Sequence, residues 1–332
     1  MQAVVLDGRG AVEITELPNL TPEAREVIIT PEAVGICGTD LHLAESDYPT
    51  GRFPVVPGHE FAGTVCAVGS EVKGYSVGDR VCVDPNVSCG ICDQCLAGAV
   101  NLCPNLVPIG VTTDGACAGQ VRAPESVVYK LPEGLDMVSG ALIEPLACVL
   151  HALTRFGRDV SGLRVLIYGA GSIGLLATAV MRADGAASVE VVEPSSVRRD
   201  AALEFGADKV FAPGERITEK DVDLVIEASG HPSAVADSLV RLANRGTLLQ
   251  MGVTSPAATI DLRPYDLFDR ELSIIGSQSL ATSFPTAVDR IRDLPDLARR
   301  MVTHTFPLSQ YAEALRAAHS EHARKVIVLP QE

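Results

Sequence analysis

The chain has 332 residues, of which 47% are hydrophobic and 21% charged, and this balance excludes a protein that is disordered throughout. Its length predicts two domains rather than one. The 27 basic and 42 acidic residues give a formal net charge of −15, which repels phosphate backbones and anionic lipids, so we expect neither a nucleic-acid nor a membrane partner. The N-terminus has no basic segment followed by an apolar one, and we expect a cytoplasmic protein.

The first 145 or so residues are rich in Val, Gly and Pro. Short extended runs (AVVLD, EVIIT, GTVCAVG and RVCVD) alternate there with turn signals such as Pro57-Gly58 and Pro132-Glu133-Gly134. This pattern predicts an antiparallel, partly barrel-like β domain with long functional loops.

From about Leu163 the pattern changes to alternating strands and helices. The apolar run RVLIYGAG leads into the helical run SIGLLATAVMRADG, and the strand SVEVVEP leads into the helix SVRRDAALEFGA. The runs DLVIEASG, GTLLQMGV and ELSIIGS then read as further strands, with a helix after the first. This alternation predicts a doubly wound parallel sheet. After about Pro285 we expect a helix, THTFPL, a second helix and a closing strand KVIVLP.

The segment 169–174 reads Gly-Ala-Gly-Ser-Ile-Gly and carries the GxGxxG pattern between a strand and a helix. Gly169 permits a tight turn, Gly171 lets the backbone approach a pyrophosphate, and Gly174 allows the helix to pack closely on the strand. The simpler interpretation is a tight strand-to-helix turn without a ligand. The sequence around the glycines favours nucleotide binding.

Glu193 ends the next strand, 19 residues after Gly174. A carboxylate there binds the hydroxyls of an adenosine ribose and repels a 2′-phosphate, which favours NAD over NADP. Arg198 and Arg199 weaken this preference, because either could reach a phosphate, so NADP is not excluded. The expected cofactor-binding residues are Gly169, Gly171, Ser172, Ile173, Gly174, Glu193, Arg198, Ala228, Ser229, Gly252 and Val253.

Four of the nine cysteines, Cys89, Cys92, Cys95 and Cys103, are clustered in a lobe over residues 85–105. In a reducing compartment such a cluster is typical of a metal site rather than of disulfides. Four thiolates close a tetrahedral structural zinc site, whereas bacterial iron–sulfur sequences have a gap of three residues before the last cysteine where this chain has seven. The other cysteines, Cys66, Cys82, Cys117 and Cys148, read as small buried hydrophobic residues.

Two glycine-bounded segments, GICGTDLH and PGHEFAG, hold further metal-binding residue types: Cys37, His59 and Glu60. Glu144 follows in EPLA. Taken singly, these residues have ordinary explanations as a core thiol, a hydrogen-bonded histidine and solvated acids. Together they predict an open catalytic zinc site, because hydride transfer from an alcohol to a nicotinamide needs an electrophile that stabilises the alkoxide.

The chain resembles the zinc-dependent medium-chain dehydrogenases, the family of sorbitol and threonine dehydrogenases. The motifs GICGTDLH, PGHEFAG, VGDRV, EPLA, YGAGSIG and THTFPL and the four-cysteine lobe carry the resemblance over essentially the whole chain. It implies a GroES-like catalytic domain, residues 1–147 and 286–332, around a Rossmann NAD-binding domain, residues 148–285. It also implies a homodimer or homotetramer.

By this resemblance, Cys37, His59 and Glu60 hold the catalytic zinc, and Glu144 is a direct or water-mediated fourth partner with a catalytic role. Asp40 orients His59. Thr39 bonds the substrate hydroxyl and begins a proton relay that ends at His42; alternatively, His42 is only a surface histidine. The two zinc sites together predict two zinc ions per chain.

The expected function is oxidation of a secondary alcohol, a polyol or a related sugar alcohol or cyclitol, to the ketone. Sorbitol-type enzymes resemble one another in an Arg-Tyr pair after the last Rossmann strand, where this chain has Ser279 and Leu280, which argues against sorbitol itself. Two alternatives are a threonine-dehydrogenase-like oxidation of an amino alcohol and a non-catalytic nucleotide- or zinc-binding protein. The complete set of relay and zinc residues argues against the non-catalytic alternative.

Overall fold

A computed structural model describes residues 1–45, 51–215 and 221–332 of the chain. It contains two compact units. The first comprises Met1–Glu144, Phe284–Ile291 and Asp296–Glu332, and the second comprises Pro145–Ser283 and Arg292–Pro295. The first unit is therefore assembled from the two ends of the chain.

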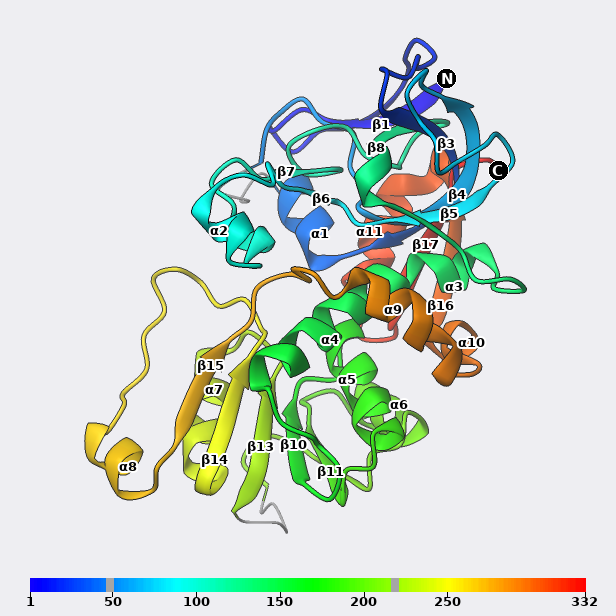
Figure 1. Ribbon diagram of the computed structural model, residues 1–332. Coiled ribbons are helices and arrows are strands. Elements are labelled where there is room, and N and C mark those ends of the chain that lie inside the picture. Colours follow the sequence, from blue (N-terminus) through cyan, green and yellow to red (C-terminus); the bar gives the residue numbers. More distant parts are fainter. Residues whose placement is uncertain (46–50, 216–220) are drawn as a thin grey trace. The chain divides into compact units, whose positions relative to one another are not determined.

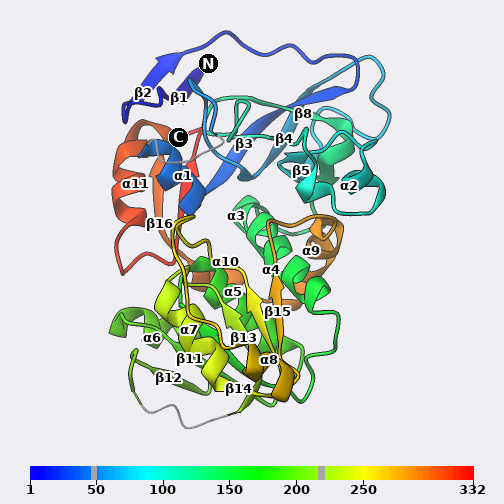
Figure 2. The same ribbon diagram turned by 90° about the vertical axis from the view of Figure 1, so that its left-hand side faces the viewer.

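The first unit is built on a seven-stranded sheet in which the long strand β3 (Glu26–Ile36) is central (Figure 2). The strands follow the order β16-β17-β3-β4-β5-β9, and β8 also pairs with β3. β3 is buried along most of its length, and its pairing with β4 shifts register between Pro31 and Ala33, where proline can be accommodated within a strand. All of these pairs are antiparallel except β16–β17. The helix α11 packs against β16 and β17.

The strands of this unit are β1 (Gln2–Leu6), β2 (Val12–Glu16), β3, β4 (Glu60–Val68), β5 (Arg80–Val83), β6 (Asn86–Val87), β7 (Val107–Pro108), β8 (Val121–Pro124), β9 (Val128–Lys130), β16 (Val302–Pro307) and β17 (Lys325–Leu329). Its helices are α1 (Gly38–Ala44), α2 (Asp93–Leu96), α3 (Met137–Ala141), α9 (Phe284–Arg290), α10 (Leu297–Met301) and α11 (Tyr311–Ala318). The helix α4 (Ile143–Phe156) begins in this unit and continues into the second.

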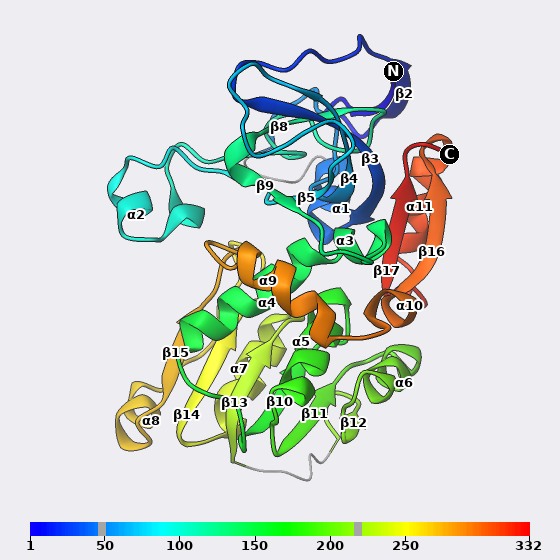
Figure 3. The ribbon, with the colours of Figure 1, turned by 45° about the vertical axis from the view of Figure 1, so that its right-hand side comes forward.

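The second unit is a six-stranded parallel sheet with the strand order β12-β11-β10-β13-β14-β15 (Figure 1; all six strands are labelled in Figure 3). Numbered within the unit, this order is 3-2-1-4-5-6, which defines the dinucleotide-binding doubly wound fold. Its central strand β10 is almost wholly buried, as expected for a strand covered on both faces. The sheet therefore confirms the parallel, doubly wound architecture predicted from the alternation of strands and helices.

The strands of this unit are β10 (Arg164–Tyr168), β11 (Ser188–Val192), β12 (Lys209–Phe211), β13 (Val222–Glu227), β14 (Leu242–Gln250) and β15 (Ser273–Gly276). Its helices, besides α4, are α5 (Ser172–Ala183), α6 (Ser196–Glu204), α7 (Pro232–Arg241) and α8 (Pro264–Asp269).

Within the described residues, one helical stretch, 137–156, is long and apolar enough to cross a membrane. Of its most apolar window, 67% is buried. A core helix of a globular protein meets the same criteria.

The expectation for the four remaining cysteines was partly wrong. Cys82 and Cys117 are buried, but Cys66 and Cys148 are only half-buried. The Sγ atom of Cys66 accepts a hydrogen bond from Nε2 of Gln120 at 3.8 Å, so this thiol has a polar neighbour.

Candidate active site and zinc centres

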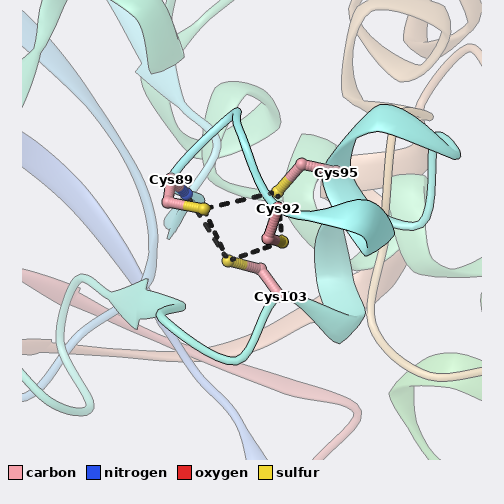
Figure 4. Close-up of side chains that lie close together, drawn as sticks. All are labelled: Cys89, Cys92, Cys95 and Cys103. Atoms are coloured by element: carbon pink, nitrogen blue, oxygen red, sulfur yellow. Dashed lines mark hydrogen bonds between the residues drawn. The ribbon is translucent and has the colours of Figure 1, made fainter.

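The four clustered cysteines direct their sulfur atoms toward one another (Figure 4). Cys89 lies 3.5 Å from Cys103 and 4.0 Å from Cys95, and Cys92 lies 3.5 Å from Cys95 and 3.8 Å from Cys103, all measured between Sγ atoms. Four sulfurs placed ~2.3 Å from a zinc ion in a tetrahedron are about 3.8 Å apart. The nine cysteines are all free thiols. The arrangement thus has the size of a zinc site with four cysteine ligands and not that of disulfides.

The lobe that carries these cysteines has little apolar core. Two short strands, β6 and β7, pair at its base, and α2 projects to one side in Figure 3. Ile91 is 81% exposed and Leu96 is 75% exposed, so hydrophobic burial contributes little to holding the lobe together. A bound metal would supply that cross-link.

One thiol of the lobe is already disposed to ionise. The backbone N–H groups of Ile91 and Cys92 lower the pKa of Cys89 to about 6. The N–H of Cys95 lowers the pKa of Cys92, but burial and the neighbouring cysteines outweigh it and raise that pKa to about 11. Because the thiolate is the form that binds a metal, the low pKa favours metal binding at Cys89.

A second group of side chains that could bind a metal lies at the ends of β3 and β4 in the same unit. The ligand atoms of Cys37, His59 and Glu60 lie within 4.8 Å of one another. Cys37 follows the end of β3, whereas His59 and Glu60 lie at the start of β4, and the antiparallel pairing of Gly35 with Glu60 brings the two segments together. A thiol, an imidazole and a carboxylate at this spacing suit an open zinc site.

Asp40 ties this group to the short helix α1. Its Oδ2 accepts a hydrogen bond from the N–H of Cys37 at 2.9 Å, and its Oδ1 accepts one from the N–H of Gly58 at 3.3 Å. Oδ1 also lies 3.6 Å from Nδ1 of His59. Burial would lower the pKa of His59, but the negative charge of Asp40 and contact with Cys37 raise it well above its usual value. The geometry suits Asp40 for orienting the imidazole.

Glu60 is held by a residue that the sequence analysis missed. The Nζ atom of Lys325, on β17, lies 2.6 Å and 2.9 Å from the two carboxylate oxygens of Glu60. Both side chains are almost fully buried. A lone lysine at the start of the apolar run KVIVLP was the only signal in the sequence.

Glu144 lies in the first turn of α4 and is 8% exposed. Its carboxylate is not among the ligand atoms that lie within 4.8 Å of one another. Burial, and then the nearby charge of Glu60, raise its pKa to about 7. The described geometry therefore brings together three of the four expected ligands, with Glu144 close enough to interact electrostatically with Glu60 and His59.

Thr39 and His42 both lie on α1, three residues apart, and so share one face of that helix. Thr39 is half-buried and His42 is exposed. A half-buried hydroxyl and an exposed imidazole are suitable ends for a proton path that leads to solvent.

The glycine-rich turn of the second unit has the backbone geometry that its sequence requires. Gly169 has φ +94°, and a Cβ atom on Gly174 would lie 2.0 Å from the carbonyl oxygen of Gly169. Side chains at either position would therefore strain the turn or separate α5 from β10. The helix begins at Ser172, with Ile173 following it.

Glu193 lies beside this turn and is 6% exposed. Its carboxylate accepts hydrogen bonds from the N–H groups of Ala170 at 2.8 Å and Ser195 at 3.0 Å. Arg199 is directed elsewhere, because its Nη1 donates to the carbonyl oxygens of Glu193 and Pro194 at 2.8 Å and 2.7 Å. Arg198 lies in the first turn of α6, where its N–H donates to Oγ of Ser195 at 3.4 Å.

The remaining expected cofactor residues lie at the carboxyl ends of β13 and β14 and are organised by Glu227, which sequence reasoning also missed. This fully buried carboxylate accepts hydrogen bonds from the backbone N–H and hydroxyl of Ser229 and from Nε2 of Gln250 at 2.7 Å. The N–H of Gly252 donates to its carbonyl oxygen at 2.8 Å. Glu227 thus connects the loops that contain Ala228, Ser229, Gly252 and Val253, where dinucleotides bind in this fold.

Sequence comparisons identify the family. Residues 23–133 match the family described as the alcohol dehydrogenase GroES-like domain, and residues 138–329 match the glucose dehydrogenase C-terminus. The chain belongs to the zinc-dependent medium-chain dehydrogenases. As a member of this family it is an NAD(P)-dependent oxidoreductase that acts on a small-molecule alcohol.

Curated relatives of this dehydrogenase align over nearly its whole length. D-Altritol 5-dehydrogenase of Agrobacterium fabrum is 35% identical, covering 93% of this chain and 94% of the relative. Sorbitol dehydrogenase of Bombyx mori is 33% identical, covering 98% of this chain and 97% of the relative. L-Threonine 3-dehydrogenase of Saccharopolyspora erythraea is 34% identical, covering 96% of this chain and 95% of the relative.

Two solved structures show the same fold with cofactors bound. A protein of Sinorhizobium meliloti 1021 assigned as a zinc-binding dehydrogenase, bound to NADP, has a TM-score of 0.94 and 33% identity, with 99% of both chains covered. An alcohol dehydrogenase of Escherichia coli CFT073 in complex with NADH has a TM-score of 0.92 and 28% identity, again with 99% of both chains covered. The dehydrogenase thus has structural neighbours with either nicotinamide cofactor.

Ser279 and Leu280, the residues expected at the position of the sorbitol-type Arg-Tyr pair, follow β15. Ser279 has φ +55° and Leu280 is completely buried.

Proposed function

We propose that this dehydrogenase oxidises a secondary hydroxyl group of a polyol or cyclitol to the ketone, with NAD as the preferred cofactor. The observation that carries the proposal is the Cys37–His59–Glu60 group, whose ligand atoms lie within 4.8 Å of one another, in a chain whose second unit is a dinucleotide-binding fold. The names of the altritol and sorbitol dehydrogenases support polyols as the substrate class.

We assign the catalytic zinc to Cys37, His59 and Glu60, with Glu144 as the direct or water-mediated fourth partner. The lobe at 85–105 would hold a second, structural zinc through Cys89, Cys92, Cys95 and Cys103, giving two ions per chain. The 3.5–4.0 Å separations of the four sulfurs support this second assignment.

When bound, zinc would lower the pKa of the substrate hydroxyl and the nicotinamide would accept the hydride. The chain's own groups would handle the proton. Thr39 would accept it from the substrate hydroxyl and pass it toward His42, whose exposure allows release to solvent. Asp40 would keep His59 in its orientation through the 3.6 Å approach to Nδ1.

The preference for NAD rests on Glu193. Its buried carboxylate lies at the glycine-rich turn, where it would accept hydrogen bonds from ribose hydroxyls and repel a 2′-phosphate. The engagement of Arg199 with backbone carbonyl groups supports the same preference, because it occupies one of the two guanidinium groups that could bind a phosphate. We keep NADP as the less favoured cofactor.

The two compact units support a catalytic domain at 1–147 and 286–332 and a coenzyme domain at 148–285.

We propose a cytoplasmic homodimer or homotetramer. Among the described strands β15 pairs only with β14, so its other edge is open, and Ile274 on it is 45% exposed. Light scattering of the purified protein would give the number of subunits.

An assay of NADH and NADPH formation tests the proposal. The panel would contain tetritols, pentitols, hexitols, cyclitols, butanediols and L-threonine, with protein that holds two zinc ions per chain. Turnover confined to one group of polyols would support the proposed substrate class. Turnover of L-threonine alone would favour the amino-alcohol alternative, for which the Saccharopolyspora relative provides the specific comparison. No turnover across the panel would contradict the proposal.

A further inference from the structure

Lys325 forms a buried ion pair with Glu60, one of the proposed catalytic zinc ligands. Each side chain is 1% exposed. The ammonium group donates to both oxygens of Glu60, at 2.6 Å and 2.9 Å, and to the carbonyl oxygen of Ile36 at 3.1 Å. A lysine has three N–H donors, so all of them are used and the ammonium has a fixed position.

The strand order of the sheet brings these two side chains into contact. Lys325 is on β17 and Glu60 is on β4, and the strand between them is β3. Gly35 of β3 pairs with Glu60 on one side and with Ile327 on the other. A Cβ atom on Gly35 would lie 2.1 Å from Oε2 of Glu60. The absence of a side chain at position 35 therefore leaves the space through which the carboxylate reaches the ammonium.

The charge balance makes this contact relevant to metal binding. Cys37, Asp40, Glu60 and Glu144 supply potential negative charge around His59, and Lys325 interacts electrostatically with three of them, Glu60, Cys37 and Glu144. An anionic Cys37 and an anionic Glu60 would by themselves cancel the charge of a zinc ion. The ammonium group returns one positive charge to the site, and its hydrogen bonds occupy lone pairs that Glu60 would otherwise offer to the metal.

We propose that Lys325 is a positioning residue for the catalytic zinc: it holds the Glu60 carboxylate over Gly35 and weakens it as a zinc ligand. This inference rests on the proposed zinc site at Cys37, His59 and Glu60. The consequence is a site in which Cys37 and His59 would provide the main attachment for the ion.

Replacing Lys325 by methionine removes the charge and keeps a side chain of similar length. Glu60 is then a buried carboxylate without its partner, which is unfavourable in the metal-free protein. Binding of a metal ion relieves that cost, so the Lys325→Met variant should bind metal at this site more tightly than the wild type, by about tenfold, the equivalent of ~1.4 kcal/mol. If Lys325 only stabilised the fold, the Lys325→Met variant would bind metal as tightly as the wild type or more weakly.

The test uses Co²⁺ in place of the catalytic zinc, with the four-cysteine site kept loaded with zinc. Competition with a chelator gives the Co²⁺ affinity, and the visible absorption spectrum reports the ligand set. Lys325→Met should bind Co²⁺ about tenfold more tightly and change the spectrum, whereas Lys325→Arg, which keeps a cation beside Glu60, should restore wild-type values. Equal or weaker binding by Lys325→Met with an unchanged spectrum would overturn the proposal.

A matched control is Lys209→Met, because Lys209 also pairs with a buried carboxylate, that of Glu190, at 3.3 Å in the other unit. This variant should keep the wild-type Co²⁺ affinity and spectrum.

If Lys325→Met does not fold, the double variant Lys325→Met/Glu60→Gln, which removes both charges, tests whether Glu60 is a weak ligand. It should bind Co²⁺ within about tenfold of the wild type, since the proposal makes Glu60 a weak ligand; a loss of binding as complete as that of His59→Ala would refute it. A wild-type protein that binds no Co²⁺ at Cys37 and His59 would instead refute the proposed function.

Discussion

The carboxylate of Glu193 accepts a hydrogen bond from the N–H of Ala170 at 2.8 Å. The strands β10 and β11 are parallel neighbours in the sheet. The acidic side chain that follows β11 therefore contacts the glycine-rich turn that follows β10. The residue that would distinguish NAD from NADP is thereby fixed relative to the turn that would hold the pyrophosphate.

Glu193→Ala should relax the preference for NAD, because it removes both the ribose acceptor and the repulsion of a 2′-phosphate. We expect kcat/KM for NAD to fall and the NAD to NADP ratio of kcat/KM to decrease at least about tenfold, which corresponds to ~1.4 kcal/mol. Steady-state kinetics with both cofactors measure the ratio. Arg182→Ala, which breaks an exposed ion pair with Asp208 on the same unit, is the control. A ratio that does not change in Glu193→Ala would contradict the ribose assignment.

His59→Ala should abolish alcohol oxidation while the fold stays intact, since it removes a ligand from the proposed catalytic zinc. Changes to residues that only orient zinc ligands cost up to about 100-fold, so we expect a larger loss of kcat/KM for the ligand itself. Metal analysis should show one zinc per chain instead of two, and circular dichroism should be unchanged. His322→Ala, at an exposed histidine, should keep full activity. Full activity in His59→Ala would rule out the zinc mechanism.

Cys92→Ser should lower stability and local order without acting on the chemistry directly. Cys92 is 3.5 Å from Cys95 and 3.8 Å from Cys103, and serine cannot replace its thiolate in a tetrahedral site. We expect the loss of one zinc per chain, a melting temperature lower by several degrees, and proteolytic cleavage within residues 85–105. Cys66→Ser, outside the lobe, is the matched control. A Cys92→Ser variant with two zinc ions and wild-type melting would show that the lobe needs no metal.

The sequence predicted the parts of the molecule whose signals are local. The parallel sheet follows from apolar strands that alternate with helices, and the close grouping of the four cysteines follows from their spacing. The glycine-rich turn could also be predicted, because Gly169 and Gly174 satisfy backbone requirements that no other residue meets as easily. Glu193 was found because the distance from that turn to the end of the next strand is regular in this fold.

The parts that could not be predicted depend on pairing between distant segments. Lys325 lies beside Glu60 only because β17 and β4 both flank β3, and a lone lysine at the start of an apolar run does not identify its partner. The role of Glu227 also could not be predicted, because it depends on contacts with Gln250 and Gly252 at the end of the neighbouring strand. The helix α1 is seven residues long, which is too short for its periodicity to be recognised, although it carries Thr39 and His42.

Asp84 should make the stability of the protein depend on pH in a defined direction. This residue follows β5 and is 9% exposed, and its Oδ1 accepts a hydrogen bond from the N–H of Asn86 at 2.9 Å. Burial raises its pKa to about 7, against the effect of that hydrogen bond, from an ordinary value of 3.8. Between these two values the folded protein keeps a proton that the unfolded chain has lost.

The free energy of unfolding should therefore fall as the pH rises from about 4 to 7, by at most ~1.4 kcal/mol per pH unit from this group, and the contribution should level off at higher pH. Asp84→Asn has no proton to lose, so its stability relative to the wild type should increase between pH 5.5 and pH 7. Urea unfolding of the zinc-loaded proteins, followed by circular dichroism because the chain has no Trp, measures the difference. Glu133→Gln, at an exposed position of the same unit, serves as control. If the stability difference between Asp84→Asn and the wild type is the same at every pH, the proton is not retained by Asp84 in the folded state.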